Sequence, residues 1–439
     1  MVKGTERKGS ERTGPKLMPI VALGLSVCLS CLLLFSAEQK PAAKLLSKPI
    51  AIKAGWVQTV TKGIIKNGVI LLRDDRIAEV GAEVVIPPGA EVFDFSDKYI
   101  MPGIVSPDSS LGIPRPSQAE ALAAATTAPS VENLANYSVL YSVYPEHPDY
   151  QQALKHGFTT LAVSPLAQGI CGLSAVIRPE GQRLKDMLVK DRVFLKVVVS
   201  VSTPFWNMMK RSLDESQKKL EELKKKEEEK KKAEAEKKKK KVEKGAEKKT
   251  DQADEEETIS EATKVFMEVV EGKLPILAEC RTPDAVDHFM ALVAAYPRVK
   301  VIVRGGPDIY KAGSILNEKK VTVILAPSIS TLMRWSLAER TNFVLKCQEL
   351  GLKLAFQPAG EVDDQIHLFD FLNQLAVYGV DKNVLLKGVT IVPAEILGLD
   401  KDVGSLEKGK KADLIVFRDD PFQNAPVVEK VISGGKFVR

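Results

Sequence analysis

Apolar and polar residues alternate at both ends of the chain, outside its first 48 residues. This period of two is typical of half-buried strands, and Asn67-Gly68 and Asp74-Asp75 supply turn residues. The alternation predicts four strands near the N-terminal end and two at the C-terminal end, at residues 50–56, 68–73, 74–81, 91–95, 412–417 and 427–432. We expect the last two to join the same small antiparallel sheet as the first four.

A different pattern begins near residue 101, where short, continuously apolar runs alternate with segments of helical period. The apolar runs are residues 159–163, 193–200, 275–278, 299–303, 321–325 and 352–356, and the helical segments are 285–295, 328–350 and 366–378. Continuously apolar strands separated by helices are typical of a parallel sheet covered by helices. The sequence therefore predicts an α/β fold.

Residues 214–262 follow neither pattern, because Lys and Glu dominate them. This block predicts a solvated arm that is partly helical or disordered and is inserted in a surface loop. A role in binding anionic surfaces or lipid headgroups is the alternative. Without the arm, residues 101–400 shrink to about 250 residues, the usual size of an eight-stranded α/β barrel.

The net charge of +6 is unevenly distributed. Residues 218–249 carry a surplus of seven positive charges and residues 1–16 a surplus of three, so the rest of the chain has a net charge of −4. An acidic body does not favour nucleic acid as a partner.

The N-terminal segment has the pattern of an export signal. Five cations in the first sixteen residues precede residues 17–35, which carry no charge. Residues 1–37 therefore predict either a cleaved signal peptide or an uncleaved membrane anchor, followed by a linker at 38–48. In both cases we expect the body to be exported to a periplasmic or other extracytoplasmic location.

Twelve residues at fixed spacing form a motif near the C-terminal end. They are Pro393, Ala394, Leu397, Gly398, Gly404, Ser405, Leu406, Gly409, Lys410, Ala412, Asp413 and Leu414. The N-terminal part adds Asn67-Gly68, Asp75-Arg76-Ile77, Val80-Gly81, Ile86-Pro87-x-Gly89 and Met101-Pro-Gly-Ile-Val105. Both sets resemble the amidohydrolase superfamily, most closely its imidazolonepropionase-like members. The resemblance implies a (β/α)8 barrel over 101–400 beside a small β-sandwich, of which residues 49–100 and 401–439 are the two halves.

The resemblance also implies a metal site at the carboxyl ends of the barrel strands, where a metal-bound hydroxide attacks a C–N bond. Its ligands are His-x-His after strand 1, Lys or Glu on strand 4, His on strands 5 and 6, and Asp on strand 8. This sequence departs from that pattern, because the corresponding positions hold Asp108, Ser110, Glu279, Arg281, Arg304 and Ala359. Lys196 is a candidate for strand 4.

The few histidines offer no substitute, since there are four in the chain and no two are closer than nine residues. We therefore expect no metal cofactor, and zinc or another divalent metal only if the motifs are misaligned. A carboxylate site of Asp108, Glu279 and Glu361 that binds magnesium or calcium weakly is a further alternative.

Two guanidinium groups near the expected metal site predict an ion network. Arg281 and Arg304 need carboxylate partners there, and Asp108 and Glu279 are the natural ones. This ion network would occupy the space that metals occupy in the family, or it would bind a carboxylate ligand. Further pocket candidates are Lys196, Cys171, Gln357 and Glu361. Cys171, Cys280 and Cys347 are expected to be buried and free, with Gly169–Gly172 forming a tight turn.

Three functions are consistent with these observations. The first is a metal-free pseudoenzyme that binds a ligand or assembles, with an active amidohydrolase paralogue or as a homo-oligomer. The second is an active hydrolase of non-peptide C–N bonds with an atypical site. The third is a membrane-tethered scaffold that uses the Lys/Glu arm.

Overall fold

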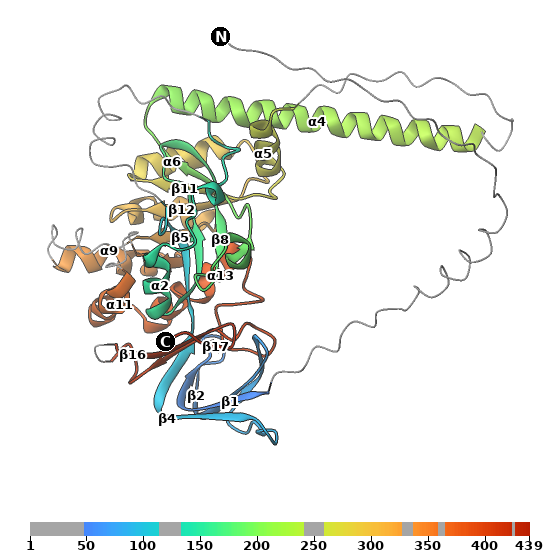
Figure 1. Cartoon of the computed structure of the whole chain (residues 1–439). Coiled ribbons are helices and arrows are strands. Elements are labelled where there is room, and N and C mark those ends of the chain that lie inside the picture. Colours follow the sequence, from blue (N-terminus) through green and yellow to red (C-terminus); the bar gives the residue numbers. More distant parts are fainter. Residues whose placement is uncertain (1–47, 114–132, 241–258, 327–336, 359–364, 424–425) are drawn as a thin grey trace, which may run out of the picture. The chain divides into compact units, whose positions relative to one another are not determined.

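The computed structural model describes residues 48–113, 133–240, 259–326, 337–358, 365–423 and 426–439 (Figure 1). Strands and helices alternate through most of these residues, which confirms the predicted α/β fold. Ala359 and Glu361, two of the candidate site residues, lie outside the described residues. So does the charge-free segment 17–35; within the described ranges, no helix is both long and apolar enough to cross a bilayer.

Strands from both ends of the chain form one seven-stranded sheet, in the order β17-β16-β15-β4-β1-β2-β3. Their bounds are β1 (Ile50–Gln58), β2 (Ile64–Arg73), β3 (Arg76–Gly81), β4 (Glu91–Pro102), β15 (Leu414–Phe417), β16 (Val428–Ser433) and β17 (Lys436–Phe437). β15 pairs with β4 in antiparallel fashion, with Ile415 opposite Met101. The prediction that the two ends share a sheet is thus confirmed, but the sheet is mixed and not purely antiparallel, because β1 and β4 pair in parallel.

This sheet curls over a core of its own, although its strands form one hydrogen-bonded sheet and not the two of a sandwich. The rings of Phe93 on β4 and Phe437 on β17 lie 4.5 Å apart between centroids. The fully buried side chains of Ile52, Ile70 and Ile432 come from three different strands and belong to the same apolar cluster. Curling therefore buries a face that a flat sheet of this size would leave exposed.

The N-terminal and C-terminal motifs contact each other directly. The Ile77 amide donates to the carbonyl of Lys410 at 2.8 Å, and the Gly409 amide donates to the carbonyl of Ile77 at 2.8 Å. The Arg76 guanidinium also donates to the Gly409 carbonyl, at 2.6 Å. The two motifs are more than 300 residues apart in sequence, and this pairing closes the sheet around both chain ends.

The rest of the body holds two further sheets. One has the order β14-β13-β12-β11-β10-β7 and the other the order β5-β6-β8-β9. The first contains β7 (Gly169–Leu173), β10 (Leu195–Val198), β11 (Ile276–Cys280), β12 (Val301–Gly305), β13 (Thr322–Leu325) and β14 (Leu354–Phe356), and the second contains β5 (Ile104–Ser109), β6 (Phe158–Val163), β8 (Ala175–Ile177) and β9 (Leu188–Lys190). β10 to β14 are parallel to one another, and β5 is parallel to β6.

Consecutive strands β7 and β8 belong to different sheets and run antiparallel to their neighbours β10 and β6. They are separated only by Ser174, whose amide donates to the Phe194 carbonyl at 3.0 Å. The prediction of a tight turn at Gly169–Gly172 is wrong, because these residues form β7. A closed barrel of eight parallel strands is not confirmed by this strand pairing.

Alternate residues along the strands enter different apolar clusters. One cluster takes a single side chain from each of several strands and is covered by α13 (Ile391–Leu397); these side chains are Val105, Ala162, Val176, Leu277, Ile302, Ile324 and Ala355. Their neighbours along the strands belong to a larger cluster with the surrounding helices. Because strand side chains alternate between faces, the first cluster marks the strand face that α13 covers.

The covering helices are short. Apart from α13 they are α2 (Pro148–Lys155), α3 (Leu184–Met187), α5 (Glu261–Val270), α6 (Pro283–Val293), α7 (Gly313–Glu318), α9 (Leu337–Glu349), α11 (Leu368–Val377) and α12 (Lys382–Gly388). α6, α9 and α11 overlap the three helical segments predicted from periodicity.

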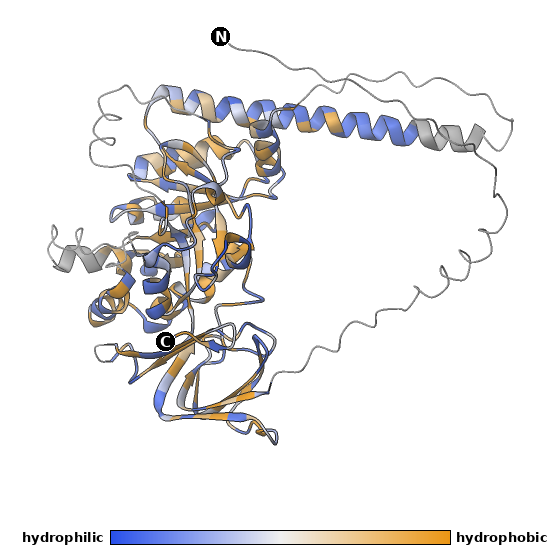
Figure 2. Ribbon diagram, viewed as in Figure 1, coloured by the Kyte–Doolittle hydropathy of each residue, from blue (hydrophilic) through white to orange (hydrophobic). Residues whose placement is uncertain are grey.

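The long helix α4 (Thr203–Lys240) contains the first part of the predicted arm. It buries Phe205, Met209, Leu213 and Leu220, whereas residues 224–232 are exposed and polar (Figure 2). At the other end, Ser260 caps α5 through the amide of Thr263. Leu220 lies within the predicted arm and is buried, so packing against the body continues past residue 214; residues 241–258 lie outside the described residues.

Candidate functional site

The strand pattern places several polar side chains next to the apolar cluster just described. Glu279, Arg304 and Gln357 each follow one of its members by two residues along the chain, namely Leu277, Ile302 and Ala355. Lys196 likewise follows Phe194 of that cluster by two residues. A spacing of two keeps a strand residue on the same face. Glu279, Arg304 and Gln357 therefore lie at or just beyond the carboxyl ends of their strands. Lys196 lies deeper, because it is the second residue of β10 and is in register with Leu277, and its side chain reaches Asp108 of β5.

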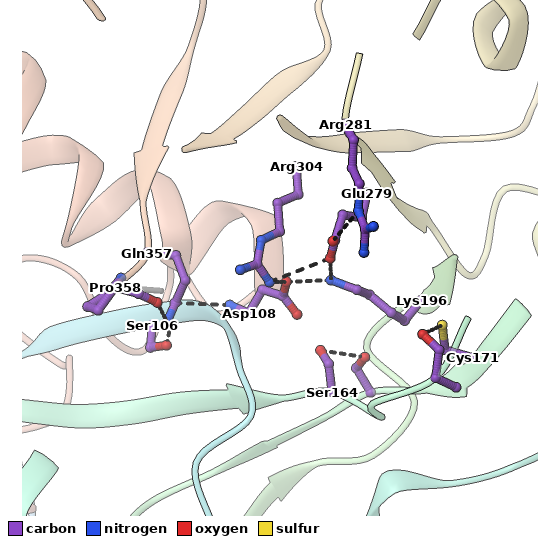
Figure 3. Close-up of polar contacts among 12 residues, drawn as sticks. Ser106, Asp108, Ser164, Cys171, Lys196, Glu279, Arg281, Arg304, Gln357 and Pro358 are labelled. Carbon is purple, nitrogen blue, oxygen red and sulfur yellow. Dashed lines mark hydrogen bonds and ion pairs between the residues drawn. The ribbon is translucent and has the colours of Figure 1, made fainter. Parts of the chain in front are cut away.

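Asp108 is the centre of an ion network, whose other members are Lys196, Glu279, Arg281 and Arg304 (Figure 3). Its Oδ2 atom lies 2.5 Å from Nζ of Lys196 and 2.5 Å from Nη1 of Arg304. The side chains of Asp108 and Lys196 are only 1% and 4% exposed. Since a buried ion is stable only when it is paired, the three groups depend on one another.

Glu279 supplies the second carboxylate. Its Oε2 atom is 3.3 Å from Lys196 and 3.8 Å from Arg304, and its Oε1 atom is 3.9 Å from Nε of Arg281. Arg281 lies at the solvent end of this series, with its side chain 67% exposed. The network thus runs from a buried aspartate to an exposed arginine.

The charges of the network fix its protonation state. Burial alone would raise the pKa of Asp108, but the positive charges of Lys196 and Arg304 outweigh it and hold that pKa far below its usual range. Burial would likewise lower the pKa of Arg304, but the charges of Asp108 and Glu279 raise it. Asp108 is therefore ionised at neutral pH and Arg304 is a permanent cation.

Three neutral groups orient the network. The Gln357 Oε1 atom accepts hydrogen bonds from Ser106 Oγ at 2.5 Å and from the Asp108 amide at 3.3 Å. Ser164, directly after β6, helps to lower the pKa of Asp108, and its hydroxyl accepts a hydrogen bond from Ser174 at 2.9 Å. Sequence analysis missed both serines, although Ser106 shares a strand with Asp108 at a spacing of two. The Gln357 contacts also join the end of β14 to β5.

Two other predicted site residues lie outside the network. Ser110 follows β5 and is partly buried, and no contact places it with Lys196 or Arg304 among the described residues. Cys171 is buried on β7, where its thiol lies 3.3 Å from the carbonyls of Ala167 and Gly169. Burial raises the pKa of Cys171 to about 11, so the thiol is protonated and unreactive at neutral pH.

The predicted state of the three body cysteines is confirmed. Cys171, Cys280 and Cys347 are buried and free. Burial also raises the pKa of Cys280 and of Cys347 to about 12. None of the three has the properties of a nucleophile.

The histidines lie on helices, away from the network. His147 caps α2, His156 ends it, and His367 precedes α11 and lies 2.9 Å from Asp370. His288 belongs to α6 and lies against Trp206. These are structural positions at helix ends and on a helix surface.

The metal ion that the amidohydrolase resemblance implies does not fit this site. A divalent cation bound to Asp108 would meet the positive charges of Lys196 and Arg304, each already 2.5 Å from the same oxygen. Within the described ranges, no three His, Cys, Asp or Glu side chains lie together so that they could hold a metal. The donor set is that of an ion-pair cluster and not of a zinc site.

Comparison with known proteins defines the class. The model of the amidohydrolase family matches residues 360–438. An amidohydrolase from Thermotoga maritima MSB8 has a similar structure, with a TM-score of 0.70, 22% identity, and coverage of 89% of this chain and 99% of that one. A prolidase complexed with N-methylphosphonate-L-proline follows with a TM-score of 0.54, 15% identity, and coverage of 89% and 99%. No curated protein matches the sequence.

These findings define an α/β protein with the fold of the amidohydrolases. The predicted resemblance is thereby confirmed as a match of the amidohydrolase family model over residues 360–438 and as a fold similar to that of an amidohydrolase.

Proposed function

We propose that this chain is an amidohydrolase-fold protein in which an ion network has replaced the metal centre. It does not hydrolyse amides, and it acts by binding or by assembly. The observation that carries this proposal is the position of Lys196 and Arg304, both 2.5 Å from the same oxygen of Asp108. A metal that activates water needs anionic or neutral ligands around it. Here two cations contact the carboxylate that would have to bind the metal.

The proposal includes a closed barrel. One apolar cluster gathers side chains from most of the strands, and Gln357 joins the end of β14 to β5. β7 pairs with β10 and the next strand, β8, pairs with β6, so these two strands connect the sheets at a second place. Such a ring would contain one antiparallel segment. Its apolar core would stabilise the fold whether or not the site is catalytic.

The proposal also places the protein outside the cytoplasm. It rests on the cations of residues 1–16 and the charge-free residues 17–35, which act as a signal or as an anchor. The partner is a second copy of the chain or an active relative. Light scattering on the purified protein distinguishes a homo-oligomer from a monomer that needs another partner.

An amide hydrolysis assay tests the proposal. N-acyl amino acids and dipeptides are incubated with the protein in added zinc or manganese, and in parallel with EDTA. Because no metal-bound water forms, we expect both rates to equal the rate in buffer. Hydrolysis that appears with metal and disappears with EDTA would instead support the alternative of an active C–N hydrolase.

A further inference from the structure

Among the described residues of the ion network, three cations share two carboxylates, which leaves an excess of one positive charge. Asp108 is compensated by Lys196 and Arg304. Glu279 lies between all three cations, and it is nearest to Lys196. Within the described ranges, the one carboxylate that Arg281 reaches is Glu279, at 3.9 Å, so its charge is the least compensated.

The excess charge lies on the solvent side. Asp108 and Lys196 are almost fully buried, whereas Glu279 and Arg304 are partly exposed and Arg281 is mostly exposed. Within the described part of the chain, Arg304 forms its contacts through Nη1 alone. The Arg281 guanidinium is therefore open to solvent directly after β11, beside Arg304 of the neighbouring strand β12, whose side chain is 21% exposed.

We propose that Arg281 and Arg304 bind a small monocarboxylate at the solvent end of the network. This ligand class rests on the proposed metal-free function. A single negative charge neutralises the excess of one, whereas a dianion such as phosphate exceeds it and is repelled by Glu279 and Asp108. Carboxylate oxygens also match the paired N–H groups of a guanidinium. Glu279 already shows how these cations hold a carboxylate.

Saturation-transfer NMR with acetate and acetamide at constant ionic strength tests this proposal, with inorganic phosphate added as a competitor of acetate at a pH of about 8, where phosphate is mostly a dianion. Acetamide has the shape of acetate without the charge. We expect acetate to bind saturably, acetamide not to bind, and phosphate to bind at least tenfold more weakly than acetate. Arg281→Gln removes the exposed guanidinium and is expected to weaken acetate binding at least tenfold.

Arg183→Gln is the matched control. Arg183 is 68% exposed, against 67% for Arg281, and it too has one carboxylate partner, Asp186. It precedes α3 and does not contact the network residues. Acetate binding should be unchanged in this variant, and the near-ultraviolet circular dichroism of both variants should match the parent.

Three results would overturn the carboxylate site: no saturable acetate binding, phosphate binding as tight as acetate, or equal losses in Arg183→Gln and Arg281→Gln. The proposed function fails differently, through metal-dependent hydrolysis measured on the same preparation. The two failures can therefore be distinguished.

Discussion

Replacing Asp108 by Asn is expected to lower the free energy of unfolding by about 3–5 kcal/mol at neutral pH. The change keeps the shape of the side chain but removes the charge that Lys196 and Arg304 share at 2.5 Å. Lys196, which is 4% exposed, then keeps only Glu279 at 3.3 Å. Urea denaturation at pH 7 measures the change.

Asp402→Asn is the control for this experiment. Asp402 also pairs with an arginine, Arg76, at 3.0 Å, but its side chain is 47% exposed. An exposed pair contributes about 0–1 kcal/mol, so this variant should remain close to the parent. Equal losses in Asp108→Asn and Asp402→Asn would refute the account of a buried, interdependent network.

The pH dependence of the Asp108→Asn effect has a definite sign. The folded pKa of Asp108 lies far below the unfolded value of about 3.9. Its contribution is therefore fully present above that unfolded pKa and is lost as the pH falls toward the folded pKa. We expect the stability difference between parent and variant to be constant above about pH 5 and to shrink below about pH 4.

Asp413→Asn is expected to have a loss of similar size, about 3–5 kcal/mol, for a reason that lies in the C-terminal motif. Asp413 is buried directly before β15 and accepts two hydrogen bonds from Arg178, at 2.6 and 2.9 Å. It also accepts from the Gly434 amide at 2.8 Å. Burial would lower the pKa of Arg178, but the charges of Asp413 and Glu180 raise it. The motif aspartate thus ties the seven-stranded sheet to the segment after β8.

Urea denaturation of Asp413→Asn, with Asp402→Asn again as the exposed control, measures this contribution. Fluorescence and circular dichroism should change together if the tie makes the body unfold as one unit. A loss below about 1 kcal/mol would mean that Asp413 and Arg178 are not a structural ion pair.

Most strands could be predicted from the sequence because their apolar runs have clear edges, as the match of residues 159–163 with β6 illustrates. β7 was missed because two glycines in five residues are more typical of a turn. The structure explains Gly172: its φ is +121°, and a Cβ atom there would lie 2.5 Å from the Tyr137 carbonyl oxygen. Glycine is required inside this strand, so composition misled the prediction.

The candidate site was predictable in part. Alternation within strands is enough to place Glu279 and Arg304 on one face, and the pairing of Arg304 with Asp108 follows from their opposite charges. The central role of Lys196 could not be derived from the sequence. Its place in the strand order depends on β7 and β8, which precede its strand β10 and were not predicted. The first turns of α4 were not predicted as a helix, because the Lys/Glu block begins only near residue 214. Phe205, Met209 and Leu213, which are spaced by four residues, indicate the helix before that block.

Metal content tests the central claim most directly. The purified full chain is dialysed against zinc and then against manganese, each followed by metal-free buffer, and bound metal is measured by mass spectrometry. The account predicts far less than one ion per chain, because Lys196 and Arg304 occupy the Asp108 carboxylate. One or two tightly bound ions per folded chain would contradict it.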